Sequence, residues 1–559
     1  MFCYQCEETL KNTACVNSGI CGKPEDVAGL HDLLLYNLKG ISFWISENKK
    51  NAITIKDATT EADHFVMDSL FTTVTNVNFD AERMKGLIET SFEIRNKYKK
   101  IYLNNHNALL NKDLTGLFPD SAIYELNEKS MDEFNKKSLS VSLPATADIY
   151  GEDILSLREL LMYGLKGAAA YAHHAYILNY EDRAIYDFFH KGLNALNKTG
   201  ISQDELVELI LECGEIGVKV MELLDRANTA HYGIPTPTSV STGTKKGKAI
   251  LISGHDLYYL EELLKQTENT GISVYTHGEM LPAHAYPVFK KYKHLVGNYG
   301  GAWWKQQDEF DRFNGSIVMT TNCIQKPKES YKNRLFTMGL VAMPEIKHIN
   351  GTDFTEVIKK AVELEGLQDK EGKKLTIGFA HDTLLNSAEK ILDLINRQKI
   401  KRFVVMAGCD GRESKREYYT KIAKKLPKDS VILTAGCAKF RYNGLELGEI
   451  EGIPRVIDAG QCNDSYSLAL TAIKLKEALN LEDINELPIY YDIAWYEQKA
   501  VLVLLSLLKL GIKNIKLGPN LPAFLSENVK NILIDQFNIM PISGCEDDLR
   551  FICGEKMNA

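Results

Sequence analysis

Seven segments with the composition of buried strands each end in a side chain that can bind a metal. In the first group AILISGH ends at His255, ISVYTHGE at Glu279 and SIVMTTNC at Cys323. In the second, RFVVMAGC ends at Cys409, SVILTAGC at Cys437, RVIDAGQC at Cys462 and PIYYDIAWYE at Glu497, with Lys499 two residues later. Side chains that follow the carboxyl ends of parallel strands gather at one edge of the sheet. Two such sheets facing each other would therefore pool these side chains in one cleft.

The residue types in this set indicate which metal they could hold. Thiolates suit soft or sulfide-bridged iron, whereas imidazole and carboxylate suit harder and more open iron positions. The set exceeds the four ligands of a tetrahedral zinc site. It predicts a polynuclear iron centre, rich in sulfide on one side and in oxygen on the other, with an iron that can bind a small substrate.

Each of these residues also has a simpler interpretation. A lone cysteine after a strand is usually a small buried hydrophobe, and a lone glutamate at a helix start usually stabilises the helix dipole. A turn from strand to helix can also bind phosphate. However, GCDGRE and SGHDLY do not match GxGxxG, and GTKKGKA lacks the spacing of a P-loop.

A second candidate site lies at the N-terminus. Cys3, Cys6, Cys15 and Cys21 follow a C-x2-C-x8-C-x5-C spacing. Four cysteines so close together predict one metal site, and its four thiolates would leave no position for a substrate. The spacing is wider than that of a usual zinc knot and differs from the common ferredoxin runs. It favours an electron-relaying iron–sulfur cluster over zinc, and zinc remains open.

The hydrophobic pattern changes along the chain and predicts three domains. Residues 25–230 carry apolar residues at helical spacing, in segments 25–45, 81–103, 151–178 and 202–227, with an interruption around 110–150. Residues 233–248 and 365–374 have the composition of linkers. Between and after them, short apolar runs alternate with helical patterns, which is typical of parallel α/β units. We expect helical bundles in 1–233 and Rossmann-like α/β domains in 234–372 and 373–559, with the metal cluster at their interface.

Composition limits the partners and the location. The chain has 559 residues, 45% hydrophobic and 25% charged, and a net charge of −8, which gives no basic face for nucleic acid or an anionic membrane. The longest apolar run, AVLVLLSLLKLGI, is too short to span a bilayer and predicts a core helix. The N-terminus does not match a signal peptide, so we expect a cytoplasmic protein. Eleven cysteines, an odd number, argue against a disulfide framework.

Taken together, these motifs resemble the hybrid-cluster proteins, also called prismane proteins or hydroxylamine reductases. The resemblance spans essentially the whole chain and rests on the cysteine quartet and on SGHDL, THGEMLPAH, TTNC, AGCDGR, TAGCAKFRYN, GQCND and WYEQKA. It implies two three-helix bundles followed by two Rossmann-like domains. It further implies a [4Fe-4S] cluster on Cys3, Cys6, Cys15 and Cys21.

The resemblance also implies a second centre, a hybrid [4Fe-2O-2S] iron–sulfur–oxygen cluster. Its ligands would be His255, Glu279, Cys323, Cys409, Cys437, Cys462 and Glu497, with Lys499 beside it and a persulfide on Cys409. The implied reaction is reduction of hydroxylamine to ammonia and water, with electrons from an external donor protein. Reduction of nitric oxide to nitrous oxide is the alternative, and Glu279, Glu497 or Lys499 would supply protons. Nickel carbon-monoxide dehydrogenases are distant relatives, and a non-catalytic metal sensor remains a further alternative.

Several other residues have chemistry that could be functional. Tyr496 and Trp495 either line the pocket or pack beside it, and His277 and His284 could support Glu279. The remaining residues are expected to be structural: Cys213 in the core, Cys545 and Cys553 as non-ligands in the tail, and His173 and His174 packed or facing solvent.

Overall fold

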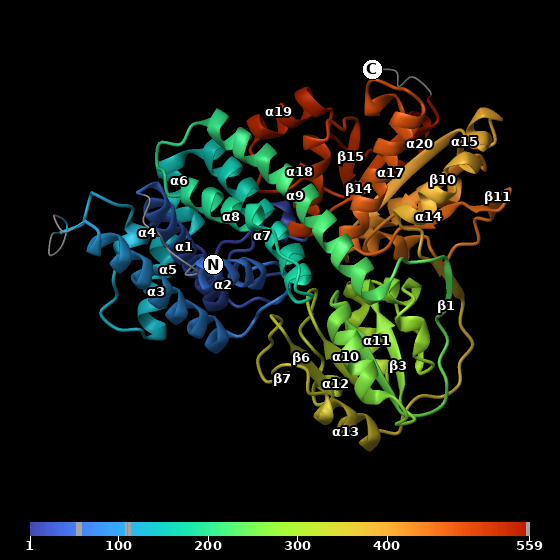
Figure 1. The fold of residues 1–559 in the computed structure, drawn as a ribbon, viewed down its shortest axis with the longest axis horizontal. Coiled ribbons are helices and arrows are strands. Elements are labelled where there is room, and N and C mark those ends of the chain that lie inside the picture. Colours follow the sequence, from blue (N-terminus) through green and yellow to red (C-terminus); the bar gives the residue numbers. More distant parts are fainter. Residues whose placement is uncertain (52–58, 107–108, 110–112, 555–559) are drawn as a thin grey trace.

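The computed structural model describes residues 1–51, 59–106, 109 and 113–554. It consists of an N-terminal helical part and two α/β parts, each with its own sheet (Figure 1). The helical part is blue to teal in the figure, the first α/β part is green to yellow, and the second is orange to red. The fold class predicted from the sequence is confirmed.

The helical part contains the four long helices that the apolar spacing predicts. They are α1 (Glu25–Lys50), α3 (Ala81–Asn104), α7 (Glu152–Tyr176) and α9 (Gln203–Tyr232). The Ser202 side chain accepts from the backbone of Glu205 and so caps the start of α9, which ends at Gly233 with φ +82°. The predicted interruption contains three short helices among its described residues: α4 (Asp120–Ile123), α5 (Met131–Val141) and α6 (Leu143–Tyr150). The other shorter helices are α2 (Thr59–Thr72) and α8 (Arg183–Ala195).

The first α/β part is built on a parallel six-stranded sheet of order β4-β3-β2-β5-β6-β7. Its strands are β2 (Ala249–Ser253), β3 (Ser273–His277), β4 (Leu295–Asn298), β5 (Ser316–Met319), β6 (Leu335–Met338) and β7 (Lys347–Ile349). Its helices are α10 (Leu257–Thr267), α11 (Gln306–Arg312), α12 (Glu329–Lys332) and α13 (Thr355–Glu363). The strands β2, β3 and β5 are those predicted to end near His255, Glu279 and Cys323.

The second α/β part repeats this topology with the order β13-β10-β9-β14-β15-β16. Its strands are β9 (Arg402–Gly408), β10 (Ser430–Thr434), β13 (Val456–Asp458), β14 (Ile489–Ala494), β15 (Ile515–Gly518) and β16 (Met540–Pro541). Strands β11 (Glu449–Ile450) and β12 (Ile453–Pro454) form a separate hairpin. The helices are α14 (His381–Asn386), α15 (Ala388–Asn396), α16 (Glu417–Lys425), α17 (Ser465–Ala478), α18 (Gln498–Lys509), α19 (Glu527–Phe537) and α20 (Cys545–Ile552).

The two segments predicted as linkers pair with each other. Strand β1 (Thr238–Ser241) runs antiparallel to β8 (Lys374–Ile377), and isolated bridges join Thr244 to Lys370 and Gly247 to Leu367. The predicted linkers thus carry backbone pairing that their composition does not indicate. Neither segment has a hydrophobic period of its own, but each satisfies the backbone hydrogen bonds of the other.

Helix α18 fastens the second α/β part to the N-terminal helices. It is the predicted apolar core helix, and it packs against α7 and α9. The contact is close: a Cβ at Gly167 would lie 2.5 Å from the Gln498 carbonyl oxygen, and one at Gly214 would lie 2.2 Å from that of Leu505. Within the described residues, no helix is both long and apolar enough to cross a membrane.

Candidate metal centre

The seven predicted side chains meet where the two sheets present their carboxyl ends. The strand order reverses between β2 and β5 in the first sheet and between β9 and β14 in the second. Such switch points are where open α/β sheets bind ligands. All seven side chains line one cavity with an empty volume of about 450 Å³: His255, Glu279, Cys323, Cys409, Cys437, Cys462 and Glu497. The structure thus brings together residues that lie up to 242 positions apart in the sequence.

His255 is held by the loop after β2. Gly254 has φ +129°, and a Cβ there would lie 2.1 Å from the Thr320 hydroxyl oxygen, so this turn requires glycine. The His255 backbone N–H donates to Thr321 Oγ1 at 2.9 Å, and Nδ1 lies 3.2 Å from the same oxygen. Burial, with a further effect of Lys499, lowers the pKa of His255 well below its usual value. The imidazole is therefore neutral at pH 7, which is the form that binds metals.

Glu279 and Cys462 complete a compact group with His255. One ligand atom from each of the three lies within 4.8 Å of the others. The Cys462 backbone N–H donates to Glu279 Oε2 at 2.9 Å, whereas Glu279 Oε1 is buried without a hydrogen-bond partner. Burial raises the pKa of Glu279. An unsatisfied buried carboxylate oxygen is costly, and a bound cation would satisfy it.

Glu497 and Lys499 form a buried network around Asn322. Glu497 Oε2 accepts from the Lys499 backbone N–H at 2.8 Å, and this bond caps α18. The Asn322 amide donates to Glu497 Oε1 at 3.3 Å and accepts from Lys499 Nζ at 2.9 Å. Lys499 Nζ also lies 3.1 Å from His255 Nε2 and 3.6 Å from Glu497 Oε1. Burial alone would lower the pKa of Lys499, but Cys462 and Glu497 outweigh it, so its pKa is raised and it carries a proton.

The four cysteines of this cavity lie in surroundings that disfavour the negatively charged thiolate. Burial raises the pKa of each thiol, and it raises that of Cys462 to about 12. Thiolates in this cavity therefore need a strong positive partner, and Lys499 is a single charge. A metal centre bound by the thiolates would supply the missing positive charge.

The N-terminal quartet forms a second group of sulfur atoms. Cys3 and Cys15 exchange backbone hydrogen bonds of 3.0 and 2.8 Å. Burial raises the pKa of Cys6, and the other three cysteines raise it further, so the four thiols interact. Four thiols are a donor set that suits either a zinc ion or an iron–sulfur cluster.

Aromatic side chains connect the two sites. Cys6, Cys323 and Cys437 pack in one buried cluster with Trp303 and Tyr496. The Glu7 backbone N–H donates to the Tyr496 carbonyl at 2.9 Å, and the rings of Tyr496 and Trp303 are 4.5 Å apart. Tyr496 also lines the 450 Å³ cavity.

Trp495 points elsewhere. Its Nε1 donates to the Asn520 carbonyl at 2.7 Å, and its ring packs against Phe524. Of the two aromatic residues before Glu497, one therefore lines the cavity and the other packs.

Each of the four histidines near the site has a hydrogen-bond partner of its own. His277 Nδ1 lies 2.9 Å from Ser253 Oγ and Nε2 lies 3.0 Å from Glu309, whereas His284 contacts the Thr276 hydroxyl at 3.0 Å, so neither is hydrogen-bonded to Glu279. His173 and His174 are buried and not solvent-facing. His173 contacts Asp68 at 2.8 Å.

His174 belongs to the surroundings of the site. Its Nδ1 lies 2.5 Å from Asp256 Oδ1, and its ring stacks on that of His255 at 6.0 Å between centroids. Helix α7 is predicted from its apolar pattern alone. That pattern gives no sign that His174 and Tyr171 approach the strand ends of an α/β part. The Tyr171 side chain lowers the pKa of the Cys462 thiol, so Tyr171 lies at the same site.

Sequence reasoning also missed Gln461. Its Nε2 donates to the carbonyls of His255 at 3.0 Å and of Glu279 at 2.7 Å, so it ties the strand-end loops of the two sheets together. The only signal was its position beside Cys462. The cysteines predicted as non-ligands stay outside the cavity: Cys213 is fully buried on α9, and Cys545 and Cys553 lie at the ends of α20.

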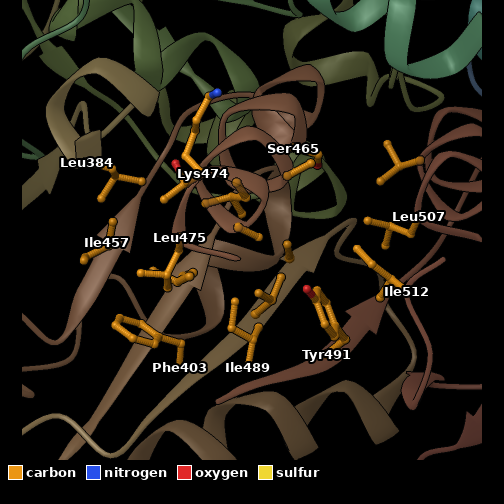
Figure 2. Close-up of a pocket in the computed structure, with 18 of the residues that line it drawn as sticks. Leu384, Phe403, Ile457, Ser465, Lys474, Leu475, Ile489, Tyr491, Leu507 and Ile512 are labelled. Carbon is orange, nitrogen blue, oxygen red and sulfur yellow. The ribbon is translucent and has the colours of Figure 1, made fainter. Parts of the chain in front are cut away.

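A separate apolar cavity leads to the same cysteines. It has an empty volume of about 1,250 Å³ and lies between the second sheet and helices α14, α15, α17 and α18. Figure 2 shows Phe403, Leu475 and Leu507 among the aliphatic and aromatic side chains that surround it. Its lining includes Cys409 and Cys462, so apolar space reaches the edge of the sheet at which the candidate ligands lie.

Comparison with known proteins agrees with this architecture. The profile of the Prismane/CO dehydrogenase family matches residues 1–550. The chain belongs to this family. A Kosmotoga olearia protein named hydroxylamine reductase is 56% identical over 558 residues, which cover 99% of both chains. A Thermosipho melanesiensis protein of the same name is 55% identical and is covered completely, with 99% of this chain aligned.

A solved structure with low sequence identity shares the fold. Carbon monoxide dehydrogenase IV from Carboxydothermus hydrogenoformans superposes with a TM-score of 0.54 at 14% identity, covering 97% of this chain and 89% of that one. At this identity the likeness concerns the arrangement of helices and sheets.

Proposed function

We propose that this protein is an iron–sulfur oxidoreductase that reduces hydroxylamine to ammonia and water. The observation that carries the proposal is the convergence of four thiols, one imidazole and two carboxyl groups on one buried cavity. Relatives more than half identical over their whole length are named for this reaction. The reaction consumes one hydroxylamine, two electrons and two protons, breaks the N–O bond, and releases one ammonia and one water.

The residues present fit two metal centres. A [4Fe-4S] cluster would be held by Cys3, Cys6, Cys15 and Cys21, whose four thiols match its number of ligands. A hybrid [4Fe-2O-2S] cluster would be held by the seven side chains of the cavity, where Glu279 Oε1 has no other partner. When bound, these centres supply the two electrons and an iron position that accepts the substrate. We infer that an external donor protein provides the electrons.

The chain's own residues would position the substrate and deliver protons. The cavity is small and buried, so it admits hydroxylamine and excludes bulk water. Lys499, which is 1% exposed, is the ammonium donor nearest to His255 and Glu497. Asn322 fixes both Lys499 and Glu497 through its two amide atoms. Lys499 would donate one proton to the departing oxygen, and Glu279 or Glu497 would donate the other proton to the nitrogen.

Anaerobic purification followed by assay tests this function. With a low-potential donor, the protein should reduce hydroxylamine stoichiometrically to ammonia, and it should contain about eight irons per chain, the count of two four-iron clusters. Zinc at the quartet without turnover would instead identify a metal-binding sensor. Nickel with oxidation of carbon monoxide would identify the chemistry for which the distant structural neighbours are named.

The apolar cavity favours nitric oxide as a second substrate. Hydroxylamine is polar and hydrogen-bonding, whereas nitric oxide is a small uncharged diatomic that partitions into apolar space. Ala472 lies on α17 and lines this cavity. Replacing Ala472 with Phe should lower kcat/KM for nitric oxide about 10-fold by filling the route, while hydroxylamine turnover changes less than about 2-fold. Hydroxylamine turnover thus reports intact folding, and an equal loss for both substrates would argue against a separate gas route.

A further inference from the structure

A third cavity lies beside the N-terminal quartet, inside the helical part. It is bounded mainly by α1 and α7, has an empty volume of about 1,530 Å³, and is lined by Cys3 and Gln5 at one end. At the other end it reaches Val141 and Ile149 on α5 and α6, and Ile149 is 60% exposed. The cavity thus joins the molecular surface to a cysteine of the quartet. The mechanism proposed above uses none of its side chains except Cys3.

Two lines of ionisable side chains run along its walls. Asp32, Tyr36 and Lys39 project from α1, and Glu159, Tyr163 and Lys166 project from α7. In each line the residues are three or four positions apart, so they lie on one face of their helix. Tyr163 and Lys166 are buried, whereas Asp32, Tyr36, Lys39 and Glu159 are partly exposed, so water reaches this wall. The composition of the wall indicates a cavity built for charge and for water.

Hydrogen bonds at the two ends of the cavity show what these lines of side chains connect. Lys166, which is buried, donates through Nζ to Gln5 Oε1 at 3.0 Å and contacts the Thr73 carbonyl at 3.5 Å. Gln5 lies between Cys3 and Cys6 in the sequence, so the inner end adjoins the quartet. At the outer end, the Tyr36 hydroxyl donates to Asp120 Oδ2 at 2.6 Å, and the Asp120 side chain is 61% exposed.

Several side chains of this cavity have pKa values that are shifted toward neutral pH. Burial raises the pKa of Asp32 to about 7, and it also raises that of Glu159. Burial, with a further effect of Arg158, lowers the pKa of Lys39 to about 8. The pKa of Lys166 is lowered by burial as well.

Several charged or titratable groups face Asp32 and Glu159 from the elements packed around them. From the two helices these are His31, Tyr36, Lys39, Arg158, Tyr163 and Lys166. From the N-terminal segment they are Cys3, Tyr4 and Lys23, and from α4, α5 and α6 they are Asp120, Lys137 and Tyr150.

We propose that this cavity is the proton-uptake site of the N-terminal metal centre, with Asp32 and Glu159 as the groups that accept the proton. The inference rests on the proposed function in one respect, namely that the quartet holds a redox-active centre. One electron added to that centre by the donor would add one negative charge beside this wall of the cavity. One proton then enters from solvent along the cavity and neutralises a carboxylate, so charge is balanced. The proton is retained while the centre is reduced and leaves when the electron moves on.

The pH dependence of the reduction potential tests this assignment. In the anaerobically purified full-length protein, an EPR-monitored redox titration of the N-terminal centre should show a potential that falls as pH rises from 6 to 9. The limiting slope for one proton per electron is about 59 mV per pH unit, the equivalent of a tenfold change in proton activity. The double variant Asp32→Asn and Glu159→Gln should hold a potential that changes little with pH. Both substitutions preserve side-chain shape, and the EPR signal itself reports that the centre has assembled.

The matched control is Glu152→Gln, which removes one carboxylate from the same helix α7 at an exposed position outside the cavity. It should keep the wild-type slope. A wild-type potential independent of pH, or a double variant with the wild-type slope, would overturn the inference and leave the proposed function intact. A quartet without any reducible centre would overturn both, so the two failures are distinguishable.

Discussion

Replacing Glu497 with Ala is expected to lower hydroxylamine turnover by at least about 10³-fold, within the range for loss of an acid–base group in an active site. The carboxylate lies on the cavity, is bonded to Asn322, and stands 3.6 Å from the Lys499 ammonium. Its removal takes away a proposed iron ligand and leaves the buried ammonium without its partner. The measurement is kcat for hydroxylamine at saturating donor, together with the optical or EPR spectrum of the N-terminal centre. That spectrum should not change, because the quartet does not include Glu497.

The variant Glu497→Gln separates ligation from helix capping. Glu497 caps α18, and loss of a cap costs about 0.5–2 kcal/mol of stability. Glutamine keeps an oxygen that can accept from the Lys499 backbone but carries no charge. We expect it to fold like the wild type and to lose most of the activity. Full activity in Glu497→Ala would contradict the assigned role.

Replacing Lys499 with Met is expected to lower kcat for hydroxylamine by about 10²–10⁴-fold, the usual contribution of a positioned proton donor. The methionine side chain fills similar space but cannot donate to the Asn322 oxygen or approach His255 as an ammonium. The measurement is kcat beside the iron content per chain, which should stay at the wild-type value. Retained iron with lost turnover assigns Lys499 to the reaction and not to assembly of the site.

The variant Lys499→Arg is the matched control for charge. Arginine keeps the positive charge beside Cys462 and Glu497. Its guanidinium is wider than the lysine ammonium and gives up a proton less readily. The variant should assemble both metal centres and show intermediate turnover. If Lys499→Met keeps more than about a tenth of the activity, another group must supply the proton.

Much of the candidate site could be predicted because strand-end position is a local property. His255, Glu279 and Cys323 follow short apolar runs with β-branched residues, and these runs form β2, β3 and β5. The two domains share one topology, so the same logic applies to Cys409 and Glu497 at the second switch point. The four long N-terminal helices follow equally from their apolar spacing.

The parts that could not be predicted depend on contacts between distant segments. The edge strand β7 has only three residues. Strands β1 and β8 lie in segments without a hydrophobic period, and each is stabilised by pairing with the other. His174 lies on a helix of the N-terminal part, yet it stacks on His255 across a domain boundary. The sequence around such a residue indicates the helix or strand that contains it. It does not indicate which distant helix or strand that residue contacts.

Iron K-edge anomalous scattering from crystals of the anaerobically purified protein would test the central claim most directly. We predict two separate groups of iron peaks. One should be bonded to the quartet, and the other should lie in the cavity, bonded to sulfur atoms together with His255, Glu279 and Glu497. Iron at the quartet alone, or a cavity that holds no iron while the protein still reduces hydroxylamine, would contradict it.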